Sequence, residues 1–411
     1  MQSILRKSAS CGNLSLFQNF RAAGAVPRGV TAIRFYPAIA SKSSTEGAEP
    51  EKSVFISQSS DIFTNLALED WLYKNFDFNK HRVLLLWRND PCVVIGRHQN
   101  PWQEVDVGLA DKNDMKIARR NSGGGTVYHD RGNLNCTFFT PRNAYDRKTN
   151  LDVICRALKR QFGVQADVTP RLDVTLDGYK VSGTASKLGK NAYHHCTVLV
   201  DADLKKLSKL LNPDTEGMDS RATKSVKAPV QNIKNANVTV SPEKVLSSIG
   251  YEFLRTTTDG NDGGAQMIEK QRGFHMINPT NDWFPGLDNL KAEMKSWSWN
   301  FGKTPEFSLK KEYLIGQDMD TLESLNIHFN LQVENGFIRS ASLQSPSGTR
   351  NFVDDTTLSD LSGFINALKD RPFHPGIVST FEGLLFKNSN KASVSVHETL
   401  EQQARNYVRN S

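Results

Sequence analysis

The chain has 411 residues, of which 38% are hydrophobic and 23% charged, a composition that fits a soluble globular protein. No apolar run approaches the roughly 20 residues that a membrane-spanning helix needs. The formal net charge is +7, but all except one unit of it lies in residues 1–45, which contain no acidic residue. The rest of the chain is nearly neutral, which argues against a nucleic-acid-binding protein.

Residues 1–45 carry arginine and lysine among many serines and alanines, with scattered apolar residues and no continuous apolar core. This composition is typical of a mitochondrial transit peptide and not of a secretory signal. A disordered basic tail is the alternative. We expect cleavage between residues 34 and 50 and a location in the mitochondrial matrix.

The first part of the fold is predicted to begin after a polar linker. Leu68, Leu72 and Phe76 repeat every four positions and predict a helix from about Phe63 to Phe76. Three apolar runs are typical of buried strands: Val83–Trp87, Val93–Gly96 and Asn135–Phe139.

Between the last two of these strands lies the stretch Arg119–Asp130, which contains Arg-Arg-Asn-Ser-Gly-Gly-Gly. Three consecutive glycines suit neither a helix nor a strand interior, and are expected where backbone passes close to a ligand. The two arginines indicate that this ligand is an anion. The stretch lacks the Lys-Ser/Thr of a P-loop and the spacing of a dinucleotide-binding fingerprint. A hairpin loop with solvated arginines is the alternative.

Clear local signals mark the middle of the chain. Gly163 ends a predicted helix that starts at Leu151, and Asp177-Gly178 predicts a hairpin between Val174–Leu176 and Tyr179–Ser182. The other expected elements are a strand at Thr197–Val200, a short helix at Leu204–Leu211 and a helix that Ser241-Pro242 opens and that runs to about Leu254.

Residues 256–265 have the composition of a loop, and the pattern changes beyond residue 285. A helix is expected near residues 287–297, and Asn335-Gly336 predicts a hairpin between Leu325–Glu334 and Phe337–Leu343. Two or three helices are expected at the end. Strands and helices do not alternate regularly, so we predict an α+β fold and not a doubly wound sheet.

A second notable stretch surrounds Lys180, which follows the Asp177-Gly178 turn on a strand with apolar neighbours. A lone strand lysine is usually a solvated edge residue. Here Val-Ser-Gly-Thr-Ala follows, which favours an ammonium directed into a cleft, able to bind a carboxylate, an acyl carbonyl or a phosphate. His194 and His195 are neighbours on a predicted strand, so at most one of them faces that cleft.

The five cysteines are scattered and form no Cys-x-x-Cys pair, so neither a metal site nor a disulfide framework is predicted. Cys136 and Cys196 lie in apolar runs and are expected to be core residues. No side chain is an obvious covalent nucleophile.

Together, these stretches resemble the lipoate-protein ligase A / lipoyltransferase family, and within it most closely the animal mitochondrial lipoyltransferases. The resemblance covers residues 53–310 well and the remainder loosely. The segments that carry it follow the family's order: Leu86–Asn89, Val93–Trp102, Arg119–Asp130, Lys180–Ala185, His194–Thr197, Ala222–Asn232, Asn278–Gly286 and Trp297–Phe307.

The resemblance implies a catalytic domain related to biotin protein ligases and class II aminoacyl-tRNA synthetases, with a mixed sheet, and a small α+β C-terminal domain. The expected organisation is a transit peptide and linker at 1–45, a catalytic domain at 50–285 and an accessory domain at 286–411. The implied activity is transfer of a lipoyl group from lipoyl-AMP, or from a lipoylated carrier, to a lysine of an acceptor domain. The implied acceptors are apo-lipoyl domains of 2-oxoacid dehydrogenase E2 subunits and the glycine-cleavage H protein. We expect a monomer that binds neither nucleic acid nor membrane.

The resemblance also assigns roles to residues. Lys180 is the implied catalytic residue, bridging the acyl carbonyl and the phosphate, and Ala185 and His195 would flank the lipoyl chain. Asp173 aligns with an acidic position near the nucleotide, and Leu172 stands where bacterial ligases carry Asn. The residues implied to line the lipoyl-AMP site are Arg120, Ser122, Gly123, Gly124, Gly125, Thr126, Val127 and Tyr128.

Three functions are compatible with this pattern. The favoured one is direct aminolysis of preformed lipoyl-AMP, for which no general base can be named. The second is a full lipoate-protein ligase that also uses ATP and Mg²⁺ to activate free lipoate. The third is a scaffold that binds lipoyl domains without catalysis, which the presence of Arg120 and Lys180 disfavours.

Overall fold

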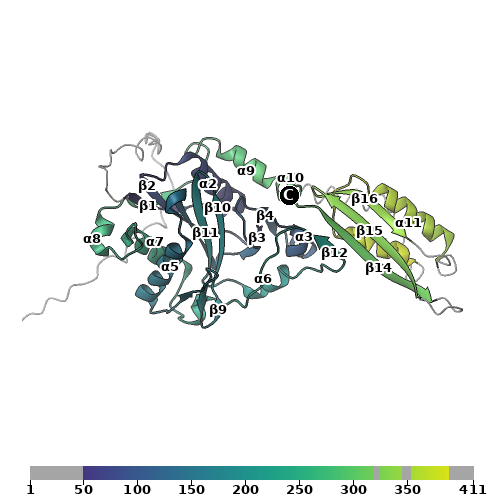
Figure 1. The fold of residues 1–411 in the computed structure, drawn as a ribbon, viewed down its shortest axis with the longest axis horizontal. Coiled ribbons are helices and arrows are strands. Elements are labelled where there is room, and N and C mark those ends of the chain that lie inside the picture. The colour runs from purple at the N-terminus through teal and green to yellow at the C-terminus, as the bar shows by residue number, and fades with distance from the viewer. Residues whose placement is uncertain (1–49, 318–323, 345–352, 388–411) are drawn as a thin grey trace, which may run out of the picture. The chain divides into compact units, whose positions relative to one another are not determined.

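The computed structural model describes residues 50–317, 324–344 and 353–387 (Figure 1). The predicted transit peptide lies outside these residues. Among the helices of the described part, none combines the length and apolar character needed to cross a bilayer. Sheets and helices are both present without regular alternation, which confirms the α+β prediction.

The largest sheet has six strands and mixed direction. β1 runs parallel to both of its neighbours, and the other strands pair antiparallel, which leaves β10 and β13 as the two edges. In spatial order the strands are β10 (Ser182–Leu188), β11 (Asn191–Leu199), β6 (Asn133–Pro141), β2 (His81–Trp87), β1 (Glu51–Ser57) and β13 (Gly273–Ile277).

Two helices, α5 (Arg147–Phe162) and α7 (Pro242–Arg255), pack against each other and cover one face of this sheet (Figure 1). α5 ends at Gly163, whose φ of 68° places it in the left-handed region, and the Ser241 side chain caps α7. Cys136 and Cys196 lie directly opposite each other on β6 and β11 and are fully buried free thiols. The prediction that they are core residues is therefore confirmed.

Smaller elements surround the large sheet. α2 (Ile62–Asn75) packs against α9 (Leu287–Lys295). One three-stranded sheet has the order β4 (Lys116–Arg119), β3 (Cys92–Ile95), β5 (Val127–His129), and another has β7 (Asp167–Val168), β8 (Val174–Leu176), β9 (Tyr179–Lys180). The short helices are α3 (Pro101–Glu104), α4 (Val107–Lys112), α6 (Leu204–Leu210), α8 (Gly264–Glu269) and α10 (Trp297–Asn300).

A four-stranded antiparallel sheet lies in the later part of the chain, with the order β12 (Met218–Ser220), β14 (Phe307–Gln317), β15 (Ser324–Glu334), β16 (Phe337–Gln344). Alternate residues of β15, from Ile327 to Val333, are buried against α11 (Asp355–Ala367) and α12 (Gly376–Leu385). β12 belongs to this sheet although it precedes residue 285, within the predicted catalytic domain. Trp102, also from that part of the chain, packs in the same hydrophobic core as β15, α11 and α12. The predicted domain boundary at residue 286 stays a prediction.

Local signals located the turns correctly. Asp177-Gly178 and Asn335-Gly336 have positive φ at both positions and join the expected hairpin strands. The sequence patterns did not predict the strand Glu51–Ser57, which lies inside the large sheet. Only three apolar residues mark this strand, and its place is fixed by pairing with the distant β13.

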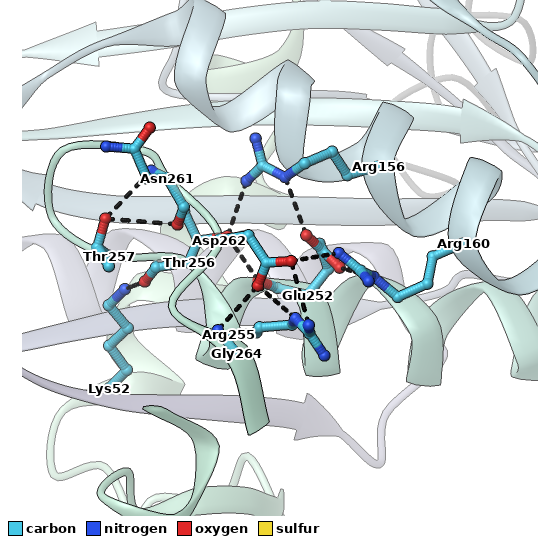
Figure 2. A network of polar contacts seen from close by, with 10 residues as sticks. All are labelled: Lys52, Arg156, Arg160, Glu252, Arg255, Thr256, Thr257, Asn261, Asp262 and Gly264. Carbon is cyan, nitrogen blue, oxygen red and sulfur yellow. Dashed lines mark hydrogen bonds and ion pairs between the residues drawn. The ribbon is translucent and has the colours of Figure 1, made fainter. Parts of the chain in front are cut away.

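Figure 2 shows how the loop-like residues after α7 are held. Glu252, buried on α7, accepts hydrogen bonds from Arg156 and Arg160 of α5, each at 2.9 Å. Asp262 accepts a hydrogen bond from Arg160 at 2.8 Å and also forms an ion pair with Arg255. Lys52 of β1 donates a hydrogen bond to the Thr256 carbonyl. Charge pairing therefore fixes a segment that has loop composition, and α8 follows it.

We expect Glu252→Ala to lower the free energy of unfolding by about 1–3 kcal/mol, because two arginines lose their shared buried carboxylate. Thermal or urea unfolding measures this change. Glu243→Ala on the same helix is the control, because Glu243 pairs with Arg88 at an exposed position and such pairs contribute about 0–1 kcal/mol. Equal losses in the two variants would show that the Glu252 cluster has no special structural role.

Candidate active site

The site is organised by two adjacent arginines at the end of β4. Arg119 is buried, and its guanidinium donates to the carbonyls of Gly96, Arg97, Gln99, Trp299 and Asn300 and to the Thr304 hydroxyl. Its backbone N–H also donates to the Asn300 side chain at 2.7 Å. Burial lowers the pKa of Arg119 to about 9, so the guanidinium keeps its charge at neutral pH. Arg119 thereby joins β4 and the Gly96–Gln99 turn to α10.

Arg120 points into the glycine-rich loop. Its guanidinium donates to the carbonyl of Gly123 at 2.8 Å, to that of Gly125 at 2.7 Å and to that of Val94 at 3.2 Å. The side chain is buried. In this structure Arg120 therefore shapes the loop by holding its carbonyls inward, and its predicted contact with an anionic ligand stays a prediction.

The loop lies along the edge strand β10. The N–H of Gly123 donates to the Ser186 carbonyl at 3.2 Å, and Val127 lies next to Gly183. Gly124 has a φ of 96°, and a Cβ there would come within 2.9 Å of the Thr184 carbonyl. Among the described residues, the N–H groups of Gly124 and Gly125 have no protein acceptor. Such free amides can bind an anion.

One largely exposed chain segment, residues 221–231, connects the loop with Lys180. Near its middle, the Ser225 hydroxyl accepts a hydrogen bond from the N–H of Thr126 at 2.8 Å and donates one to buried Glu104. At its C-terminal end, the N–H of Lys180 donates to the Pro229 carbonyl at 2.9 Å, and the N–H of Gln231 donates to the Lys180 carbonyl at 3.1 Å. Segment 221–231 thus joins the glycine-rich loop to Lys180, the two stretches that the sequence analysis had identified.

Lys180 is paired with a neighbouring acid. Its Nζ lies 2.7 Å from Oδ1 of Asp173, and both side chains are partly exposed. Leu172, just before this acid, has a φ of 62°, a left-handed conformation that Asn adopts more readily than Leu. The ion pair fixes Lys180 at the end of the hairpin, from which its ammonium remains accessible.

His195 and Ala185 lie directly opposite each other on β11 and β10, which places them on one face of the sheet, next to Gly124. His195 is buried and lies 3.0 Å from the carboxylate of Glu69 on α2. That carboxylate also accepts a hydrogen bond from Thr137 at 2.7 Å, and Thr137 accepts one from the indole of Trp87. His194 contacts Asn150 and Cys196 instead, so the two neighbouring histidines point to opposite faces, as expected for adjacent residues of a strand.

Sequence reasoning missed Glu69 and the neighbouring Asp70. Asp70 accepts from Asn121 of the loop at 2.6 Å and pairs with Lys187 of β10 at 2.8 Å and with Lys74 at 2.7 Å. Burial opposes ionisation, but the two lysines outweigh it and lower the pKa of Asp70. The available signal was two adjacent acids that follow the apolar run Leu66–Leu68 inside a predicted helix.

A cavity of about 520 Å³ opens beside the loop. It lies at the far end of β10 from Lys180, between α2, α9 and α10. The residues that line it include Asp70, Arg97, Asn121, Gly123, Lys187 and Trp299.

The structure brings most of the predicted residues together. Within the loop, Gly124 lies next to Ala185, Gly123 and Val127 contact other residues of β10, and His195 lies on the same sheet face as Ala185. Tyr128 does not face the loop: it is buried in the core cluster beneath β3, and burial raises its pKa. Its predicted contact with an adenylate, like the other site assignments, stays a prediction. In the described ranges, no group of three or more His, Cys, Asp or Glu side chains is arranged to hold a metal ion.

Comparison with known proteins gives consistent results. The profile of the lipoyl protein ligase A/B catalytic domain matches residues 61–254. The chain is 40% identical to the mitochondrial lipoyl amidotransferase LIPT1 of Homo sapiens over 294 residues, which is 70% of this chain and 74% of that protein. It is 38% identical to the lipoate-protein ligase A of Psychrobacter cryohalolentis over 59% of this chain and 70% of that protein. The crystal structure of P. falciparum LipL1 in complex with lipoate aligns with a TM-score of 0.52 and 25% identity, covering 87% of this chain and 99% of that one.

We expect Arg119→Lys to destabilise the protein by about 2–4 kcal/mol, because a lysine cannot satisfy the buried carbonyls that the planar guanidinium reaches. Thermal unfolding measures the loss. Arg171→Lys is the control at an exposed position and should change stability by no more than about 0.5 kcal/mol. A wild-type melting curve for Arg119→Lys would contradict the role given to Arg119.

We expect Gly124→Ala to lower stability by about 1–3 kcal/mol, because the backbone there is left-handed and a Cβ would press against Thr184 and Arg120. Gly123→Ala is the matched control, since its φ is not positive and a Cβ would meet no atom within 4 Å. Unfolding in urea compares the two variants. Equal stability would mean that the loop readily adopts another conformation.

Proposed function

The chain belongs to the lipoyl protein ligase A/B family and is an enzyme of lipoyl transfer, and on this premise we propose that it moves the lipoyl group from lipoyl-AMP to a lysine of an acceptor domain. The observation that carries the proposal is the continuous tract formed by the glycine-rich loop, segment 221–231 and Lys180. This tract combines free backbone amides with an accessible ammonium. A mixed anhydride of a carboxylic acid and one phosphate presents the matching groups.

In the proposed complex, the amides of Gly124 and Gly125 bind the phosphate. Arg120 stays beneath the loop and holds its carbonyls away from that phosphate. The buried positive charge of Arg120 adds to the favourable potential without direct contact. The loop is therefore suited to a single phosphate that is already joined to the acyl group.

Lys180 acts on the reacting bond. As the acceptor amine attacks, negative charge develops on the acyl oxygen, and AMP leaves with the electron pair of the broken carbon–oxygen bond while the amine loses a proton. The Lys180 ammonium stabilises both developing charges. Asp173, 2.7 Å away in the free protein, holds Lys180 ready for this task.

The lipoyl chain extends from this point along β10. Ala185, Gly124 and His195 supply its surroundings, and burying each CH₂ group contributes about 0.8 kcal/mol. Glu69 and Thr137 fix the orientation of His195 from below. The predicted flanking roles of Ala185 and His195 rest on this arrangement.

The acceptors that we propose are lipoyl domains of 2-oxoacid dehydrogenase E2 subunits, with the glycine-cleavage H protein as acceptor or as lipoyl carrier. The mitochondrial relatives and the basic N-terminal composition support a mitochondrial location, and we propose the matrix. We also propose that the enzyme is a monomer.

A lipoate-protein ligase that first activates free lipoate with ATP and Mg²⁺ is the second candidate. The 38% identity with a bacterial lipoate-protein ligase A favours it. The two candidates share the transfer step and differ only in the source of the adenylate.

The acyl donor that the enzyme requires distinguishes a transferase from a ligase. Purified protein is incubated with an apo-lipoyl domain and either synthetic lipoyl-AMP or free lipoate with ATP and Mg²⁺, and lipoylation is followed by intact-protein mass spectrometry. We expect rapid transfer from lipoyl-AMP and little from lipoate with ATP. Equally fast lipoylation from both sources would establish the ligase instead.

We expect Lys180→Ala to reduce the rate of transfer from lipoyl-AMP by roughly 10²–10³, the loss seen when one donor to a developing oxyanion is removed. Lys180→Arg should restore only part of this loss, because a planar guanidinium places its charge differently. Lys190→Ala, at an exposed lysine in the turn between β10 and β11, is the control and should keep full activity. Unchanged transfer by Lys180→Ala would refute the proposed mechanism.

A further inference from the structure

Basic side chains gather around segment 221–231, although the body of the chain is nearly neutral. Arg221 and Lys224 are exposed on the segment itself, and Lys205 and Lys209 are exposed on α6. The two α6 lysines are four residues apart and so lie on one face of the helix. We call these four residues the basic rim.

A hydrogen bond links the segment to the chain just beyond α6. Lys227 donates to the Asn212 side chain at 3.1 Å. α6 also packs against β5, the strand that continues from the glycine-rich loop. The four side chains of the basic rim thus belong to one region beside that loop.

The four cations of the basic rim form no ion pairs with described residues. Within the described ranges, none of its four side chains has a carboxylate within 4 Å. Of the acids that follow α6, Asp214 and Glu216 face Lys311 of β14, and the exposed Asp219 forms no ion pair with a described residue. An exposed surface lysine usually points to water, but four unpaired cations around one site create a local positive field.

The location of the basic rim indicates which kind of partner it can bind. Ser225, next to Lys224, touches Gly125 and bonds to Thr126, and the segment ends against Lys180. A lysine that reaches the bond under attack has to pass beside this exposed segment. The protein that carries this lysine therefore covers the segment during transfer.

We propose that the basic rim is the docking surface for an acidic face of the acceptor domain, next to the acceptor lysine. The inference rests on the proposed function and adds to it the charge of the partner and the surface that recognises it. A small donor such as an acyl adenylate carries one phosphate and does not need four cations spread over a helix and a loop. Long-range attraction of an acidic domain raises its association rate, and salt screens this attraction.

The test compares two double variants of the full chain. Lys205→Glu and Lys209→Glu, both on α6 and outside the segment that borders the site, are combined in the rim variant. The control variant combines Lys159→Glu and Lys369→Glu, which make the same change in net charge at exposed lysines of other elements. Steady-state transfer from lipoyl-AMP to an apo-lipoyl domain gives KM for the acceptor and kcat, and calorimetry gives Kd for lipoyl-AMP.

For the rim variant we expect KM for the acceptor to rise roughly tenfold, with kcat at saturating acceptor and Kd for lipoyl-AMP unchanged. The control variant should match the wild type. Added salt should raise KM for the wild type and change it little for the rim variant. Neutralising the acids beside the acceptor lysine should raise KM for the wild type but not further for the rim variant, as expected of a coupled pair of surfaces.

An unchanged acceptor KM in the rim variant overturns the inference, and so does a loss that appears only in Kd for lipoyl-AMP. Salt-dependent RNA binding by the wild type that the rim variant lacks, with unchanged acceptor KM, overturns it in favour of a nucleic acid. If the wild type itself shows no transfer from lipoyl-AMP, the proposed function fails, and this outcome is distinct from any difference between the variants.

Discussion

The site depends on two neighbouring buried cations that form no ion pair with any carboxylate of the described residues. Arg119 and Arg120 follow each other at the end of β4 and send their guanidinium groups to different places. Arg119 donates hydrogen bonds to carbonyls of the Gly96–Gln99 turn and of α10. Arg120 donates hydrogen bonds to carbonyls of the glycine-rich loop. Burying a charge is costly unless hydrogen bonds satisfy it, and here backbone carbonyls do so almost alone. Glu69 attracts Arg120 but forms no ion pair with it, so positive charge remains beneath the loop, where an anionic ligand benefits from it.

The elements around the loop complete this arrangement. Asp70 ties the loop to β10 through Asn121 and Lys187, and Ser225 ties it to the exposed segment that reaches Lys180. Backbone amides are thus presented along the edge strand of a rigid mixed sheet. A site built on such a frame needs little reorganisation when charge develops in the transition state. The same frame explains why one exposed segment can both border the reaction and meet a protein partner.

Local sequence signals predicted the turns and several helix ends, because those depend on the chain nearby, although α5 begins at Arg147 and not at Leu151. Gly163, Asp177-Gly178 and Ser241-Pro242 each have a backbone or capping reason that needs no distant partner. The order of motifs predicted the family and the α+β fold. The sequence could not show that Arg120 holds the loop from inside, that Glu69 supports His195, or that Glu51–Ser57 form an inner strand, since each depends on contacts far apart in the chain. The paired acids of α2 were the one overlooked local signal for this network.

The most direct test of the account is a crystal structure with a non-hydrolysable analogue of lipoyl-AMP. We predict that its phosphate-like group accepts hydrogen bonds from the amides of Gly124 and Gly125, that Lys180 turns from Asp173 toward the acyl carbonyl, and that the lipoyl chain lies beside Ala185 and His195. An analogue bound elsewhere, for example in the cavity beside Asp70 and Lys187 with the loop amides and Lys180 unengaged, would contradict it.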